Sequence, residues 1–184
     1  MGRLSRPAAF LDRDGTINVS PGDHEYITSG SDFEWLPGAR EGMVRLARGG
    51  FVLAIVSNQR GVGLGLVPRT VLREIEELIQ TELARCECQV EGFRYCFHDV
   101  GESCACRKPR PGLLLDLSRQ LNVDLSRSWM IGDMDSDVLA GSSAGCRTAL
   151  IGSQPRRARP DLVAPSLDAV SKRITSHMPD LTQS

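Results

Sequence analysis

The chain has 184 residues, 41% of them hydrophobic and 24% charged, and its 22 basic and 23 acidic side chains leave a formal net charge of −1. A chain of this length can bury a core without disulfides, so we expect one soluble domain spanning residues 1–184. The balanced charge argues against proteins that coat nucleic acids or bind membrane surfaces through a basic excess. No apolar run is long enough to span a membrane, and residues 1–6 lack the apolar core of a signal peptide, so we expect a cytoplasmic protein.

Apolar runs alternate with amphipathic helical stretches along the whole chain. The runs predict strands at 8–11, 51–56, 93–96, 129–131, 148–151 and 162–164. Helical spacing of apolar residues predicts helices at 39–48, 68–83, 113–121, 138–144 and 167–174. The run at 51–56 has no polar alternation, which is typical of a central parallel strand. Strict alternation of strand and helix predicts an α/β fold of three layers, a Rossmann-like parallel sheet between helices.

Polar residues follow three of the predicted strands. Asp12 and Asp14 come two positions apart after the first strand, so an extended backbone would project both to one side and Arg13 to the other. Ser57 and Asp133 directly follow two later strands. Parallel sheets bind ligands outside the carboxyl ends of their strands, so we expect these segments to meet in one crevice.

The carboxylates of this crevice predict a metal ion. Asp12, Asp14, Asp133 and Asp137 would repel one another unless a cation lies between them, and an all-oxygen set suits Mg²⁺. Lys108 adds a fixed positive charge from another segment. Carboxylates, Mg²⁺ and a lysine together describe a receptor for phosphate.

Neutral donors are expected in the same crevice. The side chain of Ser57 and the backbone amides of Asn58 and Gln59 could donate hydrogen bonds to an oxyanion. Taken alone, the segment 12–15 favours an ordinary turn after a strand. The agreement of four separate segments favours a catalytic site.

The motifs Asp12-Arg13-Asp14-Gly15-Thr16, Ser57, Lys108-Pro109 and Gly132-Asp133-x-x-x-Asp137 resemble, in order, the four motifs of the haloacid dehalogenase superfamily. The resemblance implies that Asp12 is a nucleophile that takes up a phosphoryl group and that Asp14 is the general acid and base. It also implies that Asp12, the backbone carbonyl of Asp14, and Asp133 hold Mg²⁺, with Asp137 outside the direct ligands. Ser57 and Lys108 would complete the catalytic set.

A second cluster lies in the loop of residues 96–106, here called the cysteine loop. Cys96-x-His98 and Cys104-x-Cys106 supply three thiolates and an imidazole, a tetrahedral ligand set for Zn²⁺. Four protein ligands leave no open position, so the zinc would be structural and would order the loop. Free thiols or a disulfide are the alternative.

The cysteine loop leads directly into Arg107-Lys108-Pro109-x-Pro111-Gly112, and this arrangement resembles the D-glycero-D-manno-heptose-1,7-bisphosphate 7-phosphatases and the related histidinol-phosphate phosphatases. The resemblance implies that Arg107 binds the second phosphate of a sugar bisphosphate. The gaps between motifs have no room for a cap domain, so loops would select the substrate. The implied substrate contacts are Arg13, Ser20, Asp23, His24, Tyr26, Asn58, Gln59, Arg60 and Arg107.

Two positions depart from the pattern of that group: the segment 20–26 carries the equivalent of three extra residues, and Met134 stands where a lysine often follows the motif aspartate. The sequence predicts a monomeric Mg²⁺-dependent phosphomonoesterase with an aspartyl-phosphate intermediate, acting on the 7-phosphate of a heptose bisphosphate. The alternatives are a small phosphate ester such as histidinol phosphate, a polynucleotide 3′-phosphate, and a non-catalytic zinc-loop interaction module. Anomer preference and pathway stay open.

Overall fold

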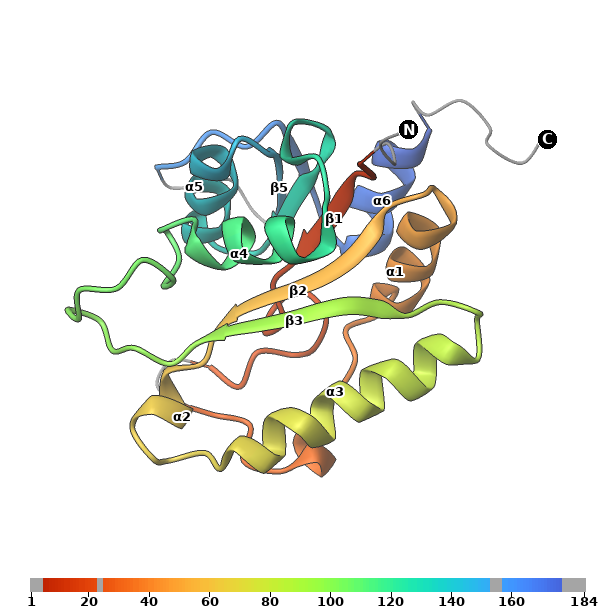
Figure 1. Cartoon of the computed structure of the whole chain (residues 1–184). Helices are drawn as coiled ribbons and strands as arrows, with labels where there is room; N and C mark the ends of the chain where they lie inside the picture. The colour runs from red at the N-terminus through yellow and green to blue at the C-terminus, as the bar shows by residue number, and fades with distance from the viewer. Residues whose placement is uncertain (1–4, 23–24, 153–156, 177–184) are drawn as a thin grey trace.

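A computed structural model describes residues 5–22, 25–152 and 157–176, and these residues form one parallel sheet between two layers of helices (Figure 1). The six strands are β1 (Ala8–Leu11), β2 (Val52–Asn58), β3 (Val90–Cys96), β4 (Trp129–Gly132), β5 (Arg147–Ile151) and β6 (Leu162–Ala164). Their order in the sheet is β3-β2-β1-β4-β5-β6, and every pairing is parallel. The predicted three-layer α/β architecture is therefore confirmed.

The helices cover both faces of this sheet. In Figure 1, α4 (Gly112–Leu121) and α5 (Asp135–Ala144) lie on one face, and α1 (Ala39–Arg48), α3 (Arg69–Ala84) and α6 (Leu167–Thr175) lie on the other. A short helix, α2 (Arg60–Gly63), follows β2, and single 3-10 turns occupy Gly30–Asp32 and Leu125–Arg127. None of the described helices combines the length and apolar character needed to cross a membrane.

Alternation along the strands builds two cores. Leu11 and Ile55 point to the face covered by α1, α3 and α6, whereas Phe10 points to the face covered by α4 and α5. Both faces of the central strands are therefore buried, which explains why their sequences lack polar alternation. Each fully buried large apolar side chain stabilises the fold by about 1.5–3 kcal/mol.

Three element boundaries differ from the predicted ones by two residues or more. β2 continues through Ser57 and Asn58 because both residues still pair with β3. β3 begins at Val90, three positions before the predicted start. The prediction starts too late because Gly92 weakens the strand signal in the sequence. α5 begins at Asp135 because the Asp137 carboxylate accepts a hydrogen bond from the amide of Met134, at 3.0 Å, and caps the helix.

The strand order brings two distant segments together. β1 and β4 are neighbours at the point where the order of the sheet reverses, and the amide of Asp12 donates to the carbonyl of Ile131 at 2.9 Å. The carboxyl ends of these strands carry Asp12 and Asp133, so the crevice predicted from sequence lies at the switch point of the sheet.

Candidate active site

Three of the four predicted carboxylates converge beyond the ends of β1 and β4. Oxygen atoms of Asp12, Asp133 and Asp137 lie within 4.8 Å of one another. Asp12 is only 8% exposed and Asp137 only 1% exposed. So many carboxylates in a buried space need a cation to offset their repulsion.

Lys108 supplies one such charge. Its Nζ atom lies 2.8 Å from Oδ1 of Asp12 and 2.6 Å from Oδ1 of Asp137, and it donates to the carbonyl of Val56 at 2.9 Å. Burial alone would lower the pKa of Lys108, but the two carboxylates outweigh it and raise the pKa above its usual value. The lysine is therefore a permanent cation beside Asp12.

The backbone of Lys108 is fixed by Asn58. The side-chain amide of Asn58 donates to the carbonyl of Lys108 at 3.1 Å, and its oxygen accepts the amide of Lys108 at 3.0 Å. The residue predicted from sequence as a substrate contact thus uses its side chain to hold the lysine, although it also borders the adjoining pocket.

The three clustered carboxylates carry more negative charge than Lys108 can offset. Burial raises the pKa of Asp12 to about 6, with Lys108 opposing the rise and Asp137 adding to it. Burial together with the charges of Asp12 and Asp137 raises the pKa of Asp133 to about 7. Oδ1 of Asp133 is buried and has no hydrogen-bond partner among the described residues. A hard, oxygen-only donor set with an unsatisfied carboxylate atom fits Mg²⁺.

Gly15 lets Asp133 approach the first loop. Its φ is +82°, a left-handed conformation, and a Cβ atom built there would lie 2.2 Å from Oδ2 of Asp133. Only glycine satisfies both requirements. The Gly in the motif after Asp14 is therefore needed for the carboxylate cluster itself.

Asp14 lies apart from the other carboxylates in a network of donors. Arg13 donates to it from Nε at 3.1 Å and from Nη2 at 2.8 Å, and Asn18 donates from Nδ2 at 2.9 Å. Gln59 donates from Nε2 to Asp14 at 2.9 Å and to Oγ of Ser57 at 3.0 Å. The prediction that Arg13 points away from the aspartates is wrong, because β1 ends at Leu11 and strand alternation does not continue into the turn.

The backbone amide of Gln59, predicted as an oxyanion donor, binds a carbonyl of the neighbouring strand instead. The backbone amide of Gln59 donates to the carbonyl of Cys96 at 2.7 Å, because β2 pairs with β3 up to Asn58, which lies opposite Cys96. It therefore does not face the crevice. Ser57 is 2% exposed and stays beside the carboxylates through Gln59.

A pocket of about 310 Å³ adjoins Asp14, and most of the predicted substrate contacts line it. They are Arg13, Ser20, Tyr26, Asn58, Gln59, Arg60 and Arg107. The ring of Tyr26 packs against the backbone of α2, where a Cβ atom on Gly61 would lie 2.5 Å from the ring. Asp23 and His24, also predicted as contacts, lie outside the described residues.

A second cavity approaches the carboxylates from the side of α1 and α6. Its volume is about 500 Å³, and both Asp133 and Thr16 line it. The hydroxyl oxygen of Thr16 is buried and has no partner among the described residues. Of the three clustered carboxylates, Asp133 lines this cavity, whereas none lines the pocket beside Asp14.

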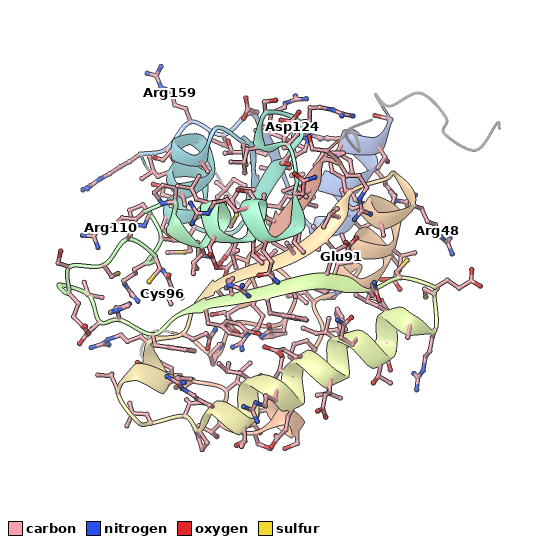
Figure 2. The ribbon with its side chains drawn as sticks, in the orientation of Figure 1. Arg48, Glu91, Cys96, Arg110, Asp124 and Arg159 are labelled. Carbon is pink, nitrogen blue, oxygen red and sulfur yellow. The ribbon has the colours of Figure 1, made fainter. Side chains whose placement is uncertain are left out.

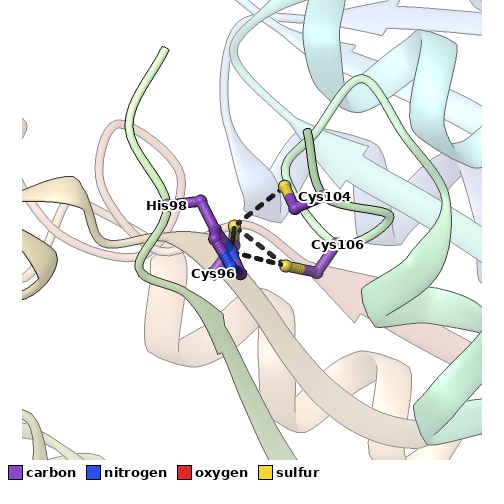
Figure 3. Close-up of side chains that lie close together, drawn as sticks. All are labelled: Cys96, His98, Cys104 and Cys106. Carbon is purple, nitrogen blue, oxygen red and sulfur yellow. Dashed lines mark hydrogen bonds between the residues drawn. The ribbon is translucent and has the colours of Figure 1, made fainter. Parts of the chain in front are cut away.

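The four residues of the predicted zinc set also converge (Figure 3). Sγ of Cys96 lies 3.1 Å from Sγ of Cys106, 4.0 Å from Sγ of Cys104 and 3.4 Å from Nδ1 of His98. None of the six cysteines forms a disulfide, so free thiols are the alternative that remains beside a zinc site. Spacings of 3–4 Å between ligand atoms are compatible with a tetrahedral Zn²⁺ with bonds of about 2.0–2.3 Å.

The surroundings of Cys104 favour a thiolate, whereas burial raises the pKa of Cys96 to about 12. Burial would raise the pKa of Cys104, but hydrogen bonds from the amides of Arg107 and Cys106 outweigh it and lower the pKa to about 7. Arg110 donates from Nη1 to the carbonyl of Cys104 at 2.6 Å and lies 3.7 Å from its sulfur. Figure 2 shows Cys96 and Arg110 on the side of the molecule to which the cysteine loop projects. A thiolate is the form that binds zinc.

Two contacts of the site were not assigned from sequence. Asn18, fully buried, holds Asp14, and Asp99 in the cysteine loop binds the guanidinium of Arg60. Asn18 lies only four residues after Asp14, so the sequence carries a local signal for this contact. A single acid in a polar loop gives no such signal, and the role of Asp99 depends on the folded path of the chain.

Comparisons with known proteins agree with this geometry. A sequence profile described as HAD-hydrolase-like matches residues 105–170. The chain is 39% identical over 152 residues to the D-glycero-beta-D-manno-heptose-1,7-bisphosphate 7-phosphatase of Photorhabdus laumondii, and the match covers 79% of each chain. The protein of the same name from Escherichia coli K12 is 33% identical over 186 residues, covering 97% of this chain and 93% of the relative.

A solved structure also matches over nearly the whole chain. The crystal structure of D,D-heptose 1,7-bisphosphate phosphatase from B. bronchiseptica, complexed with magnesium and phosphate, aligns with a TM-score of 0.81 at 28% sequence identity. The alignment covers 92% of this chain and 98% of that one. The chain therefore belongs to the heptose-bisphosphate phosphatases, a family of phosphomonoesterases within the haloacid dehalogenase-like hydrolases.

Proposed function

We propose that the protein hydrolyses the 7-phosphate of D-glycero-β-D-manno-heptose 1,7-bisphosphate with Mg²⁺ as cofactor. The observation that carries the proposal is the buried cluster of Asp12, Asp133 and Lys108 beside a pocket lined by Arg60 and Arg107. The carboxylates and the lysine suit a phosphoryl group undergoing transfer, and the two arginines suit a second phosphate on the same small molecule. Relatives at 33–39% identity carry that name.

In the proposed first step, a carboxylate oxygen of Asp12 attacks the phosphorus of the 7-phosphate. A bond forms between Asp12 and phosphorus, the bond from phosphorus to the sugar oxygen breaks, and Asp14 gives a proton to the departing oxygen. In the second step water attacks the phosphorus, Asp14 takes a proton from the water, and phosphate leaves Asp12. Lys108 and Ser57 bind the transferring oxygens.

Asp12, Asp133 and the backbone carbonyl of Asp14 would hold Mg²⁺ in this proposal. The bound ion supplies charge that keeps the carboxylates ionised and offsets the charge of the phosphoryl group. Asp137 keeps a separate role, because its ion pair with Lys108 holds the lysine in place.

We propose that Cys96, His98, Cys104 and Cys106 bind a structural Zn²⁺ and that loops select the substrate in place of a cap domain. The closed ligand set leaves no position for chemistry. Thiolates that serve as ligands need a reducing compartment, which supports a cytoplasmic location. A monomer over residues 1–184 is proposed as the working unit, which size-exclusion chromatography with light scattering can test.

A phosphate-release panel tests the proposal. Purified protein with Mg²⁺ is given the β and α anomers of the heptose bisphosphate, histidinol phosphate, fructose 1,6-bisphosphate and a 3′-phosphorylated oligonucleotide. We expect the β-anomer to give the highest kcat/KM. Asp12→Asn should lower turnover by several orders of magnitude, because the amide retains the shape but loses the nucleophile.

The matched control is Asp116→Asn, which makes the same chemical change at an exposed carboxylate paired with Arg94. This control should keep wild-type rates. Equal rates for the Asp12→Asn variant and the control would remove the proposed mechanism. A higher kcat/KM for histidinol phosphate or the oligonucleotide would replace the proposed substrate.

A further inference from the structure

The pocket beside Asp14 obtains its two outer arginines from different segments. Arg60 begins α2, directly after β2, and Arg107 follows the cysteine loop. The loop and α2 lie at the same end of the sheet in Figure 1. Neither segment is a long helix or a central strand, so something other than the core must fix these side chains.

Arg60 is held by Asp99. Its Nε atom contacts Oδ1 of Asp99, and its Nη2 atom lies 3.3 Å from Oδ2 of the same carboxylate. Two parallel contacts fix the plane of a guanidinium as well as its position. They occupy the edge of the guanidinium that carries Nε and Nη2, and Tyr26, which lines the same pocket, is a further hydrogen-bond partner of Arg60.

Asp99 is itself fixed by the cysteine loop. It directly follows His98, its backbone amide donates to a carboxylate oxygen of Glu102 at 2.7 Å, and its Oδ1 accepts the amide of Val100. A carboxylate with this backbone support has little freedom to follow a moving arginine. Asp99 therefore transmits the position of the loop to Arg60.

Arg107 is tied to the same loop by separate contacts. Its backbone amide donates to Sγ of Cys104 at 3.4 Å, and its Nη1 atom donates to the carbonyl of His98 at 3.0 Å. Both outer arginines, Arg60 and Arg107, thus depend on the four-residue cysteine and histidine cluster, Arg107 directly and Arg60 through Asp99.

We propose that Asp99 is a positioning residue that orients Arg60 for the second phosphate of the substrate. The inference rests on the proposed function, because it requires a substrate with two phosphates. The ion pair is partly exposed on both sides, 30% for Arg60 and 37% for Asp99, so it contributes little to folding stability. Its consequence is in binding, because a free arginine must be ordered each time a substrate binds.

Steady-state kinetics on Asp99→Ala and Asp99→Asn test the proposal. For the β anomer of heptose 1,7-bisphosphate, KM should rise about tenfold while kcat changes by less than about twofold, as expected when one long side chain must be ordered on binding. For heptose 7-phosphate, which lacks the second phosphate, KM should stay at the wild-type value. Asp116→Asn is the matched control and should leave both KM values unchanged.

A double-mutant cycle separates action through Arg60 from a general effect on the loop. In an Arg60→Ala background, Asp99→Ala should add no further rise in KM. Melting temperature and zinc content of each variant are measured alongside. Any one of four results would overturn the role of Asp99. The first two are an unchanged KM in the single Asp99 variants and an equal rise in KM in the wild-type and Arg60→Ala backgrounds. The other two are an equal rise in KM for both substrates and loss of zinc in both Asp99 variants.

The outcome also distinguishes this inference from the proposed function. If the wild-type protein releases no phosphate from the bisphosphate, both fail together. If the wild-type protein is active and Asp99→Ala has wild-type KM, only the role of Asp99 fails.

Discussion

Replacing Lys108 by Met removes a buried cation and leaves its acidic partners in place. The lysine is 4% exposed, and its Nζ atom contacts Asp12 at 2.8 Å and Asp137 at 2.6 Å. Removing one partner of a buried ion pair destabilises a protein by about 3–5 kcal/mol. For a chain of this size, about 2–4 °C per kcal/mol gives a fall in Tm of about 6–20 °C.

The predicted loss depends on pH. Lys108 lowers the pKa of Asp12, so its removal allows Asp12 to keep a proton at higher pH. A carboxyl group whose folded pKa is raised destabilises the fold increasingly as pH rises above the unfolded value of about 4. The difference in Tm between Lys108→Met and wild type should therefore be smaller at pH 5.5 than at pH 8.

The assay is thermal unfolding by circular dichroism in magnesium-free buffer at both pH values. The matched control is Lys172→Met, which breaks an exposed helical pair with Asp168 at 2.6 Å and should lower Tm by less than about 4 °C. Adding Asp137→Asn to Lys108→Met removes one stranded carboxylate and should recover part of the loss. A Tm for Lys108→Met within about 2 °C of the control, or a loss that does not depend on pH, would refute the reasoning.

Three further predictions concern the metal sites. In magnesium-free buffer the Tm of the wild-type protein should fall between pH 5 and pH 8. The reason is that Asp12 and Asp133, with pKa values of about 6 and about 7, bind protons more tightly in the folded than in the unfolded state. Saturating Mg²⁺ should remove this dependence of Tm on pH. Gly15→Ala should weaken Mg²⁺ binding, measured by titration calorimetry, at least about tenfold, because its Cβ atom would lie 2.2 Å from Oδ2 of Asp133. Cys104→Ser should lower both Tm and the zinc content found by elemental analysis, because it removes one of four ligands.

Matched controls exist for two of these predictions. Gly65 also has a left-handed φ, +73°, but no atom lies within 4 Å of a Cβ built there, so Gly65→Ala should leave Mg²⁺ affinity unchanged. Cys86 lies outside the cluster, and Cys86→Ser should retain full zinc content. If Gly65→Ala weakened Mg²⁺ binding as much as Gly15→Ala does, the proposed magnesium site would be contradicted. If Cys86→Ser lost as much zinc as Cys104→Ser, the proposed zinc site would be contradicted. A Tm that is flat from pH 5 to pH 8 without Mg²⁺ would contradict the first prediction.

The sequence predicted those parts of the site that depend on strand order. Asp12 and Asp133 follow apolar runs, and parallel strands bring their carboxyl ends to one edge, so the convergence of the two residues follows from the pattern alone. The cysteine loop was predictable for a similar reason, because paired Cys and His spacing is a local property of the chain.

The interactions around Asp14 could not be predicted in the same way. β1 ends before Asp12, and the turn that follows carries the guanidinium of Arg13 back onto Asp14. The direction of a side chain in a turn is not given by strand periodicity. The same limit applies to α2, whose two glycines give little helical signal. It also applies to Gln59, whose side chain donates to Ser57 and to Asp14, which lies 45 positions earlier in the chain.

The place of β3 at the border of the sheet has a consequence for how specificity can change. Asp12, the proposed nucleophile, follows β1, which has neighbours on both sides. The cysteine loop follows β3, which among the described strands has a neighbour on one side only. Insertions or deletions in that peripheral loop can reshape the mouth of the pocket without moving the strands beneath the reacting groups. Chemistry and selectivity are therefore separable in this architecture, and engineering of new phosphate-ester preferences can begin at the periphery.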